Sequence, residues 1–518
     1  MCLTRVDGLP DEMLEKIFSY LSFEYLRTVT TICRRWNYLT ARLVASKAQL
    51  VVKVENNSTE NCRQALLASQ RNYKQILFWF IDDASSDDGT NNGTEIHAIS
   101  ELLCRMLMKF GPSIKTLILH QRVPNEIVEL ATISRALSLC PNLEIFQIDR
   151  VLFYETDRNQ TVKFDVLPSL QEFNNRSNLL DWFEFDLKVI SPNLTRFRVN
   201  LMRNPKLIQC LVHFQSQITE LHISCEFPES KSEMYFFKKL KFPRLEKLSM
   251  MFAANGVSMQ PIHSFLKQHN ILKEVLMEQQ VKADVLKSLA SSRKTLKRLS
   301  LNTQDFETLY LDNFECLEMF KLNYTYFKLP PSFDPSPMPV MRMLRHLNLY
   351  NVTIPNPDEF NALLRHAFPA LETLELINIC RRRTREYILS FYQRMLRGLV
   401  SLKRLTLSES QEEELDTDLF CFLNTSMHLH ELRLKFKKLS EYSFESETFS
   451  LQKMTLDVKQ MSYNYLCKLL VPFPELSRIE LQSKCLSTQE VNFARKKWPH
   501  CEIVCKHEIE VEILFPET

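Results

Sequence analysis

A short apolar pattern recurs along most of the chain. Its form is LxxLxL with other apolar residues allowed, and clear copies begin at Leu194, Ile218, Leu245, Leu296, Leu317, Leu344, Leu371, Leu402, Leu429, Leu451 and Leu476. Weaker copies begin at Ile114, Leu143, Leu170 and Leu272. Because side chains alternate between the two faces of a strand, the fourth and sixth residues of each copy point inward and the third, fifth and seventh outward. The pattern predicts one short strand for each copy.

Helical patterns separate the copies. Successive copies begin about 21 to 31 residues apart, a spacing that resembles the period of leucine-rich repeats. The segments between them include residues 387–399 and 462–470, whose apolar spacing predicts helices. A strand and helix of this kind can cover their apolar faces only by stacking on neighbouring copies, so we expect a curved solenoid with a concave parallel sheet and outer helices.

The copies depart from the leucine-rich-repeat pattern in one respect. That family usually carries Asn or Cys three residues after the sixth position, where the side chain bonds to backbone groups of the turn. Here those places hold Val151, Met202, Gln304, Val352, Ile379 and Ser410. We therefore expect turns that are looser or are packed by apolar contacts. The polar segment 82–94 and the proline-rich segment 330–339 predict insertions, the second being a spacer or a binding loop.

The first fifty residues carry two helical patterns instead. Pro10 suits the first turn of a helix, and Asp11 and Glu12 complement the positive end of its dipole. One apolar series consists of Met13, Leu14, Ile17, Phe18 and Leu21, and a second, after a break near Ser22, consists of Leu26, Val29, Cys33, Trp36 and Leu39. So short a segment cannot bury two apolar faces by itself, so we expect one face to meet a partner.

These residues resemble the F-box motif in order and spacing, with LPDE from Leu9, L..IF.YL from Leu14 and L..V...CRRW from Leu26. The resemblance implies a surface for a Skp-type adaptor, and through it a cullin-RING scaffold, that is formed or supported by Leu9, Pro10, Leu14, Ile17, Phe18, Leu26, Cys33 and Trp36. Without the resemblance, the same segment is a helical hairpin with Phe18 and Trp36 in its core. We expect Cys33 to be a small buried thiol rather than a ubiquitin-accepting nucleophile.

The outward strand positions supply candidate target-binding side chains. They include Arg298, Lys321, His346, Tyr350, Arg404 and Arg433, with acidic residues interspersed. Guanidinium groups bind carboxylate and phosphate with two hydrogen bonds, so one hypothesis is that this face recognises an acidic or phosphorylated target segment. The alternative, favoured for any single residue, is that these charges solvate the face and pair across neighbouring strands.

Two smaller clusters have the composition of a candidate site. Arg381, Arg382, Arg383 and Arg385 form the densest basic run, which predicts a solvated loop, with nuclear targeting or a phosphate contact as alternatives. Cys501, Cys505 and His507 have the spacing CxxxCxH, which lacks a clear fourth ligand, so we predict no metal site.

Composition narrows the remaining classes of function. The net charge of +3 over 518 residues gives no overall field for nucleic acid or an anionic membrane. The 14 cysteines lack paired spacing, which favours a reducing compartment, cytoplasmic, nuclear or both. Apolar stretches such as residues 76–81 are too short to span a membrane, and Asp7, Asp11 and Glu12 interrupt any signal peptide. With six glycines and no phosphate loop, we expect no cofactor and no active site.

We therefore predict an α/β protein with a helical F-box at residues 1–48 and a degenerate leucine-rich-repeat solenoid at residues 49–518. The resemblance implies a non-catalytic substrate-receptor subunit of a Skp-cullin-F-box ubiquitin ligase. Such a subunit would hold the lysines of a target protein near a charged conjugating enzyme, which leads to ubiquitination and proteasomal degradation. The alternative is a repeat scaffold, or an inhibitor that binds the adaptor without promoting ubiquitin transfer.

Overall fold

The computed structural model describes residues 9–505 except 22, 48, 55–63, 65–72, 81–92, 122–126, 155–163, 177–186, 201–204, 226–234, 253–259, 283–284, 304, 308–313, 325, 329–339, 355, 380–390, 393, 397–398, 410–413, 416–427, 440–449, 461, 472 and 482–485. The chain divides into two compact units, Met1–Leu245 and Glu246–Thr518. The boundary that the sequence suggests near residue 48 stays a prediction.

Three short helices open the first unit, namely α1 (Asp11–Ser19), α2 (Phe23–Thr30) and α3 (Arg34–Lys47). Helix α1 begins directly after Pro10, as the sequence indicates, and carries Asp11 and Glu12 in its first turn. The break between the two apolar series falls at Ser22, between α1 and α2. The existence of a helical N-terminal segment is thereby confirmed.

A parallel ladder of strands follows in the first unit. Its strands are β1 (Gln49–Val54), β2 (Gln75–Phe80), β3 (Thr116–Gln121), β5 (Ile145–Asp149), β7 (Glu172–Arg176), β8 (Arg196–Asn200) and β9 (Glu220–Cys225). Each strand pairs in parallel with the next one named. The pair β4 (Ile127–Glu129) and β6 (Leu152–Tyr154) is also parallel.

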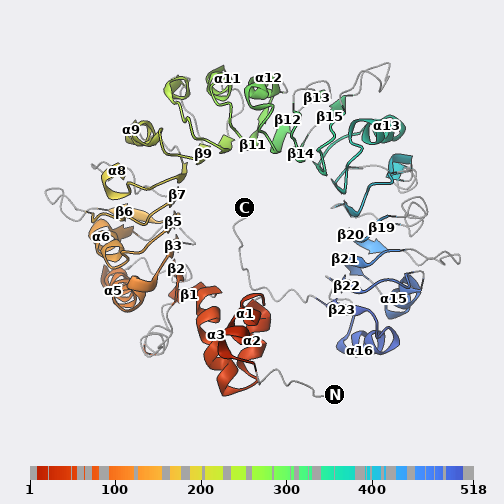
Figure 1. Cartoon of the computed structure of the whole chain (residues 1–518), viewed down its shortest axis with the longest axis horizontal. Helices are drawn as coiled ribbons and strands as arrows, with labels where there is room; N and C mark the ends of the chain where they lie inside the picture. The colour runs from red at the N-terminus through yellow and green to blue at the C-terminus, as the bar shows by residue number, and fades with distance from the viewer. Residues whose placement is uncertain are drawn as a thin grey trace. The chain divides into compact units, whose positions relative to one another are not determined.

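The helices of the first unit that follow α3 lie on one side of this ladder (Figure 1). They are α5 (Gly93–Phe110), η2 (Gly111–Ser113), α6 (Leu130–Ser138), α8 (Leu187–Ile190), α9 (Pro205–Phe214) and η3 (Tyr235–Lys239). Helix α5 begins at Gly93, so the insertion expected at residues 82–94 ends two residues earlier than the sequence suggests. Residues 82–92 of this insertion lie outside the described residues.

The second unit repeats this arrangement. Its ladder consists of β10 (Lys247–Phe252), β11 (Glu274–Val281), β12 (Arg298–Thr303), β14 (Met319–Asn323), β16 (His346–Tyr350), β17 (Thr373–Ile377), β18 (Arg404–Ser408), β20 (Glu431–Leu439), β21 (Lys453–Gln460), β22 (Arg478–Leu481) and β23 (Glu502–Cys505), each parallel to the next. The strand β19 (Glu414–Leu415) also pairs with β20, and β13 (Asp305–Glu307) pairs with β15 (Tyr326–Lys328).

The helices of the second unit again lie on one side of its strands (Figure 1). They are α11 (Gln260–Lys267), α12 (Val285–Leu289), η4 (Ala290–Ser292), α13 (Pro357–Ala367), α15 (Tyr463–Leu470) and α16 (Thr488–Lys497). The helix predicted at residues 462–470 is confirmed as α15. Each unit is therefore a solenoid-like α/β arrangement, in which a strand and its return segment stack on the next.

The alternation predicted for each copy is confirmed where the strands are described. In β16, Leu347 and Leu349 are buried, whereas His346, Asn348 and Tyr350 on the other face are half-buried. Burying one such leucine contributes about 1.5–3 kcal/mol relative to leaving it exposed. All copies named above carry a strand, whereas β1 and β2 have no leucine pattern and were not predicted.

The turn after the strand has a recurring backbone conformation. Two residues after the sixth position, φ is positive at Arg150 (60°), Tyr324 (50°), Asn351 (52°) and Asn378 (55°). Each of these residues donates its N–H to a carbonyl at the end of the next strand, as Asn351 does to Ile377 at 2.8 Å. The turn is thus closed by the backbone, without the side chain that the leucine-rich-repeat pattern usually supplies.

The following residue packs into the core. Val151, Val352 and Ile379 are all buried, which confirms the apolar alternative for these turns. Met202, Gln304 and Ser410, as well as residues 330–339, lie outside the described residues.

One turn contains a buried acid. Glu409 is buried and its Oε1 accepts hydrogen bonds from the Ile379 N–H at 3.1 Å and from the Tyr392 hydroxyl at 2.6 Å. A buried carboxyl group is tolerated when hydrogen bonds of this kind satisfy its oxygens. The Glu409 side chain thus connects two successive turns with the return segment between them.

Aromatic rings stack along the core of the first unit. The rings of Phe146 and Phe173 are 5.8 Å apart, those of Phe173 and Phe197 are 5.9 Å apart, and both pairs are nearly parallel. Phe214 on α9 closes the series at 6.0 Å from Phe197. All four side chains are buried. Because one ring contacts its counterpart on the next strand, the stack links β5, β7 and β8.

We expect Phe173→Ala to lower the free energy of unfolding by about 3–5 kcal/mol, because it removes the central ring and leaves a cavity. Chemical denaturation followed by circular dichroism measures this loss. The control Gln147→Ala, at an outward position of β5, should change stability by no more than about 0.5 kcal/mol. Equal effects of the two substitutions would contradict the stacked core.

Candidate functional site

The N-terminal helices form a small core of their own. Leu14, Phe18, Leu26 and Leu39 are buried, and the rings of Phe18 and Trp36 are 5.1 Å apart. Leu9, Leu21, Val29 and Leu43 pack against this cluster. Of the residues expected to contact the adaptor, Leu14, Phe18 and Leu26 therefore support the helices from inside.

An ion pair fixes the start of α1 against α3. The Arg35 guanidinium donates to Asp11 Oδ1 at 2.6 and 2.9 Å, and to the Leu9 carbonyl at 2.7 Å. Because a guanidinium carries several donors in a rigid plane, it can hold a carboxylate and a carbonyl together. These bonds, together with the packing of Leu9 against the helical core, hold Leu9 and Pro10 beside α3.

Several apolar side chains of these helices remain exposed. Met13 is 52% exposed, Ile17 44%, Tyr20 80% and Ile32 57%, and Pro10 is exposed as well. Adjacent exposed apolar side chains mark interaction surfaces more often than structural ones. Of the residues expected to contact the adaptor, Pro10 and Ile17 are thus accessible, and Leu9 and Trp36 are partly so.

The expectation that Cys33 is a buried thiol is wrong. Cys33 is exposed, because the helical series from Leu26 to Leu39 is interrupted by a turn at residues 31–33. Its carbonyl accepts from the Asn37 N–H at 2.9 Å and its Sγ from the Trp36 N–H at 3.4 Å, which is the arrangement of a residue that caps a helix. Cys33 positions the start of α3 and leaves its sulfur at the surface.

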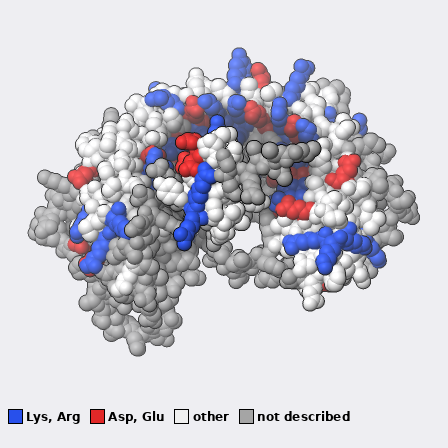
Figure 2. Space-filling view, turned by 60° about the horizontal axis from the view of Figure 1, so that its bottom comes forward, with Lys and Arg blue, Asp and Glu red and all other residues white. Residues whose placement is uncertain are grey.

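Outward side chains of the second unit form the face expected to bind a target. In Figure 2, Lys and Arg side chains are interspersed with Asp and Glu on the visible face. Arg298 lies 3.8 Å from Glu274, Lys435 lies 2.9 Å from Asp457, and Arg478 lies 2.9 Å from Glu480. For these residues the structure supports pairing across or along strands.

The other candidate target-binding residues on this face do not form such ion pairs among the described residues. Lys321, Arg404 and Arg433 are exposed, and none has an acidic partner within 4 Å among the described residues. His346 is half-buried, and its pKa is lowered chiefly by burial and then by the charge of Arg404. The Tyr350 ring contacts that of Tyr324 edge to face, 5.6 Å away. The structure thus brings cations and aromatic rings onto one face.

The first unit has a face that sequence reasoning missed. The rings of Trp79 and His120 are 5.2 Å apart, and His120 Nδ1 lies 3.0 Å from Asp149 Oδ2. Burial alone would raise the pKa of Asp149, but the hydrogen bond and charge of His120, with the charges of Arg176 and Arg150, hold it below its usual value.

The neighbouring row on this face is apolar. Val51, Leu77 and Ile118 are paired partners on β1, β2 and β3, and Val51 is 45% exposed. The signal in the sequence was ILFWFI at residues 76–81, whose alternate residues Leu77 and Trp79 point outward from a strand.

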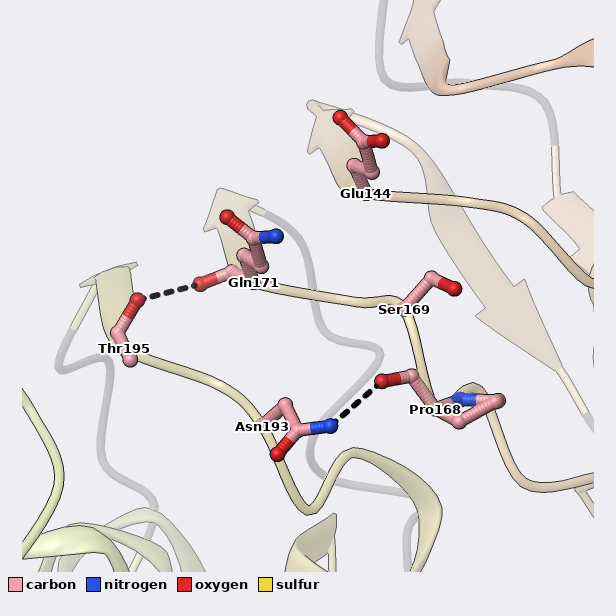
Figure 3. Close-up of a pocket in the computed structure, with 6 residues that line it drawn as sticks. All are labelled: Glu144, Pro168, Ser169, Gln171, Asn193 and Thr195. Carbon is pink, nitrogen blue, oxygen red and sulfur yellow. Dashed lines mark hydrogen bonds between the residues drawn. The ribbon is translucent and has the colours of Figure 1, made fainter.

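Figure 3 shows a polar depression of about 330 Å³ at the start of β5, β7 and β8, lined by Glu144, Pro168, Ser169, Gln171, Asn193 and Thr195. The Asn193 amide donates to the Pro168 carbonyl at 2.8 Å, as Asn142 does to Pro112 at 2.9 Å. The depression is therefore one copy of a turn that recurs along the ladder.

Neither the Cys501, Cys505 and His507 cluster nor the basic run Arg381–Arg385 forms a binding site among the described residues. Burial raises the pKa of Cys501 to about 11 and also raises that of Cys505, which disfavours the thiolates that zinc needs. His507 and Arg381–Arg385 lie outside the described residues. In the described part of the chain, no three His, Cys, Asp or Glu side chains gather as metal ligands, and no helix has the length and apolar character needed to cross a membrane.

Comparison with known families agrees with the geometry of the helices. The F-box-like family model matches residues 6–44, which include α1, α2 and most of α3. This match indicates an adaptor-binding module of a Skp-cullin-F-box ubiquitin ligase, whose F-box subunits are typically non-catalytic. No curated protein matches the chain.

His222, at an outward position of β9, provides a test of how strongly the face of the first unit buries its side chains. Burial, followed by the charges of Arg198 and Arg176, lowers the pKa of His222 to about 4. The unfolded chain therefore binds a proton at this residue between about pH 6.5 and 4 that the folded chain does not bind. The free energy of unfolding should fall as pH drops through this window, by up to about 1.4 kcal/mol per pH unit from His222 alone.

We expect His222→Gln to remove this contribution. Urea unfolding of both proteins at several pH values between about 6.5 and 4 measures the difference, and comparison with the natural chain cancels the titration of other groups. Parallel stability curves for the two proteins would show that His222 is not held neutral by its surroundings.

Proposed function

We propose that this chain is the substrate-receptor subunit of a Skp-cullin-F-box ubiquitin ligase. Its N-terminal helices bind the Skp-type adaptor, and its repeats, which we assign to the leucine-rich class, bind a protein target. The observation that carries the proposal is the F-box-like match at residues 6–44 together with the exposed apolar side chains Met13 and Ile17 on helix α1.

Packing within the N-terminal helices explains why we expect Met13 and Ile17 to contact a partner protein. Leu14 and Phe18 already fill the contact of α1 with the other helices, whereas Met13 and Ile17 stay 52% and 44% exposed. Covering apolar area contributes roughly 25 cal/mol per Å², so a complementary adaptor surface would gain from both residues. The fold thus leaves about half of each of these two side chains open to an adaptor surface.

The assignment of the repeats rests on spacing and alternation. Copies recur about every 21 to 31 residues, each with a strand whose fourth and sixth residues are buried. The turns are closed by backbone bonds and apolar residues in place of the usual Asn or Cys. We regard the array as a degenerate member of the class.

The mechanism is proximity. Such a receptor holds target lysines near a conjugating enzyme carried by the cullin scaffold, which replaces a bimolecular encounter with a local one. No bond is made or broken by this chain. The proposal places it in the cytoplasm, the nucleus or both.

The proposal predicts that Met13→Ala with Ile17→Ala weakens adaptor binding about tenfold or more, because two apolar contacts are lost while the helical core is kept. Titration of the full chain with purified adaptor, followed by calorimetry, measures the change. Lys16→Ala, at an exposed charged position of the same helix, is the matched control.

Two results would contradict the proposal. One is unchanged adaptor affinity in the double variant with a folded helical segment. The other is that purified adaptor and cullin, bound to the full chain, do not stimulate ubiquitination of any protein co-purified with it, which would favour a scaffold or inhibitor.

A further inference from the structure

The outward face of the second unit combines paired and unpaired cations. Most of its Lys and Arg side chains have an acidic neighbour within 4 Å, such as Lys453 with Glu431 at 2.9 Å. Lys321, Arg404 and Arg433 have none among the described residues. Within the described part of the chain no acid neutralises these three charges, so we treat them as candidates for pairing with a ligand.

Strand register places these three cations on one surface. Lys321 on β14 and Arg433 on β20 occupy the same row, through Asn348, Glu375 and Thr406 on the strands between them. Arg404 lies on β18, two residues before Thr406. Four strand intervals of about 4.8 Å put Lys321 and Arg433 about 19 Å apart.

The surrounding residues leave this surface positive. Glu375 is the one acid in the row from Lys321 to Arg433, all of whose residues are described. The row that contains Arg404 carries Met319, His346 and Thr373 on the preceding strands and Glu431 on the following strand, where Lys453 lies 2.9 Å from Glu431 and offsets its charge. Arg404 and His346 lie in the same row with Thr373 between them, and the charge of Arg404, after burial, contributes to the lowered pKa of His346.

We propose that the face from β14 to β20 binds an extended, unphosphorylated acidic segment of a target protein, whose separated carboxylates pair with Lys321, Arg404 and Arg433. This inference rests on the proposed receptor function and specifies the chemistry of its target. It selects three of the candidate residues and sets Arg298 aside, because Arg298 lies beside Glu274.

Distance argues for an extended segment with several acids. Lys321 and Arg433, about 19 Å apart across the strands, are too far from each other to share one anionic group. A segment in extended conformation advances about 3.4 Å per residue, so about six residues separate the acids that reach the two ends. One acid near Lys321 and others near Arg404 and Arg433 match this spacing.

Glu375 argues for carboxylates over phosphate. It lies between the cations, on the strand adjacent to the one that carries Arg404. A phosphate group carries about −1.5 to −2 charges at neutral pH, so its repulsion from Glu375 exceeds that of a carboxylate. Glu375 also favours a neutral or basic residue in the middle of the segment.

Binding of this kind should be weak at each contact and sensitive to salt. An exposed ion pair contributes about 0.2–1 kcal/mol, and screening reduces it as the ionic strength rises. Three such contacts on a rigid sheet can still discriminate between targets through their spacing.

The test uses the full chain and a fluorescein-labelled peptide in which two Asp pairs are separated by about four uncharged residues, the spacing set by strand geometry. Fluorescence anisotropy measures its affinity at low and at physiological salt. We expect the variant Lys321→Gln, Arg404→Gln, Arg433→Gln to bind at least about threefold more weakly, as three exposed pairs imply.

The matched control is the variant Arg298→Gln, Lys435→Gln, Arg478→Gln, which removes the same net charge from paired positions of the same face. It should bind within about twofold of the natural chain, and thermal unfolding should show that both variants are folded. Equal weakening by both variants, or absence of salt-sensitive binding to the natural chain, would overturn the inference.

Two further peptides test the form of the ligand. One has four contiguous Asp residues, and the other has one phosphoserine and no carboxylate side chain. We expect both to bind more weakly than the spaced peptide. Equal or tighter binding of either one would show that the face does not select separated carboxylates.

Adaptor binding is measured on the same protein preparation. If adaptor is captured and the spaced peptide is not bound, the inference fails and the receptor function stands. If the peptide is bound and adaptor is not captured, the proposed ligase function fails and the acidic-segment site remains.

Discussion

The structure depends on one constraint, which is that no strand with its return segment can cover its own inward side chains. Leu347 and Leu349 on β16 are buried because β14 and β17 lie alongside and the outer segments close over them. In the first unit, the stacked rings of Phe146, Phe173 and Phe197 likewise cover one another from neighbouring strands. Stability in such an array is approximately a sum of terms between neighbours, so the ladder has to be continuous within each unit.

This constraint leaves the opposite face free for function. Inward positions are mostly apolar, the buried Asn175 on β7 being an exception, whereas outward positions such as Lys321, Asn348 and Glu375 contribute little to the core. The N-terminal helices divide their side chains in the same way, with Leu14 and Phe18 inside and Ile17 outside. In both parts, the residues that fold the chain and those available to partners alternate along the same element.

The sequence allowed much of this to be predicted, because inward leucines follow a strict local period. The strands from β3 to β22 that begin beside a repeated leucine could be found in this way, whereas β1 and β2 lack that pattern. Cys33 was misplaced because its side chain follows a helical period only if α2 and α3 are continuous, and a turn of three residues separates them. Arg298 and Glu274 hold the third position of successive copies, so their adjacency follows from the repeat and agrees with the expected pairing across neighbouring strands, whereas the ion pair itself depends on side-chain conformations that the pattern does not give.

The left-handed residues at Arg150, Tyr324, Asn351 and Asn378 have a consequence for how such a chain can evolve. Each directs its backbone N–H forward to the next strand, so the end of the strand is fixed before the return segment begins. Residues gained or lost by insertion or deletion beyond that point do not shift the register of the strands that follow. In proteins descended from a common ancestor with this chain, the outer segments can therefore change in length and composition while the outward side chains of neighbouring strands keep their register.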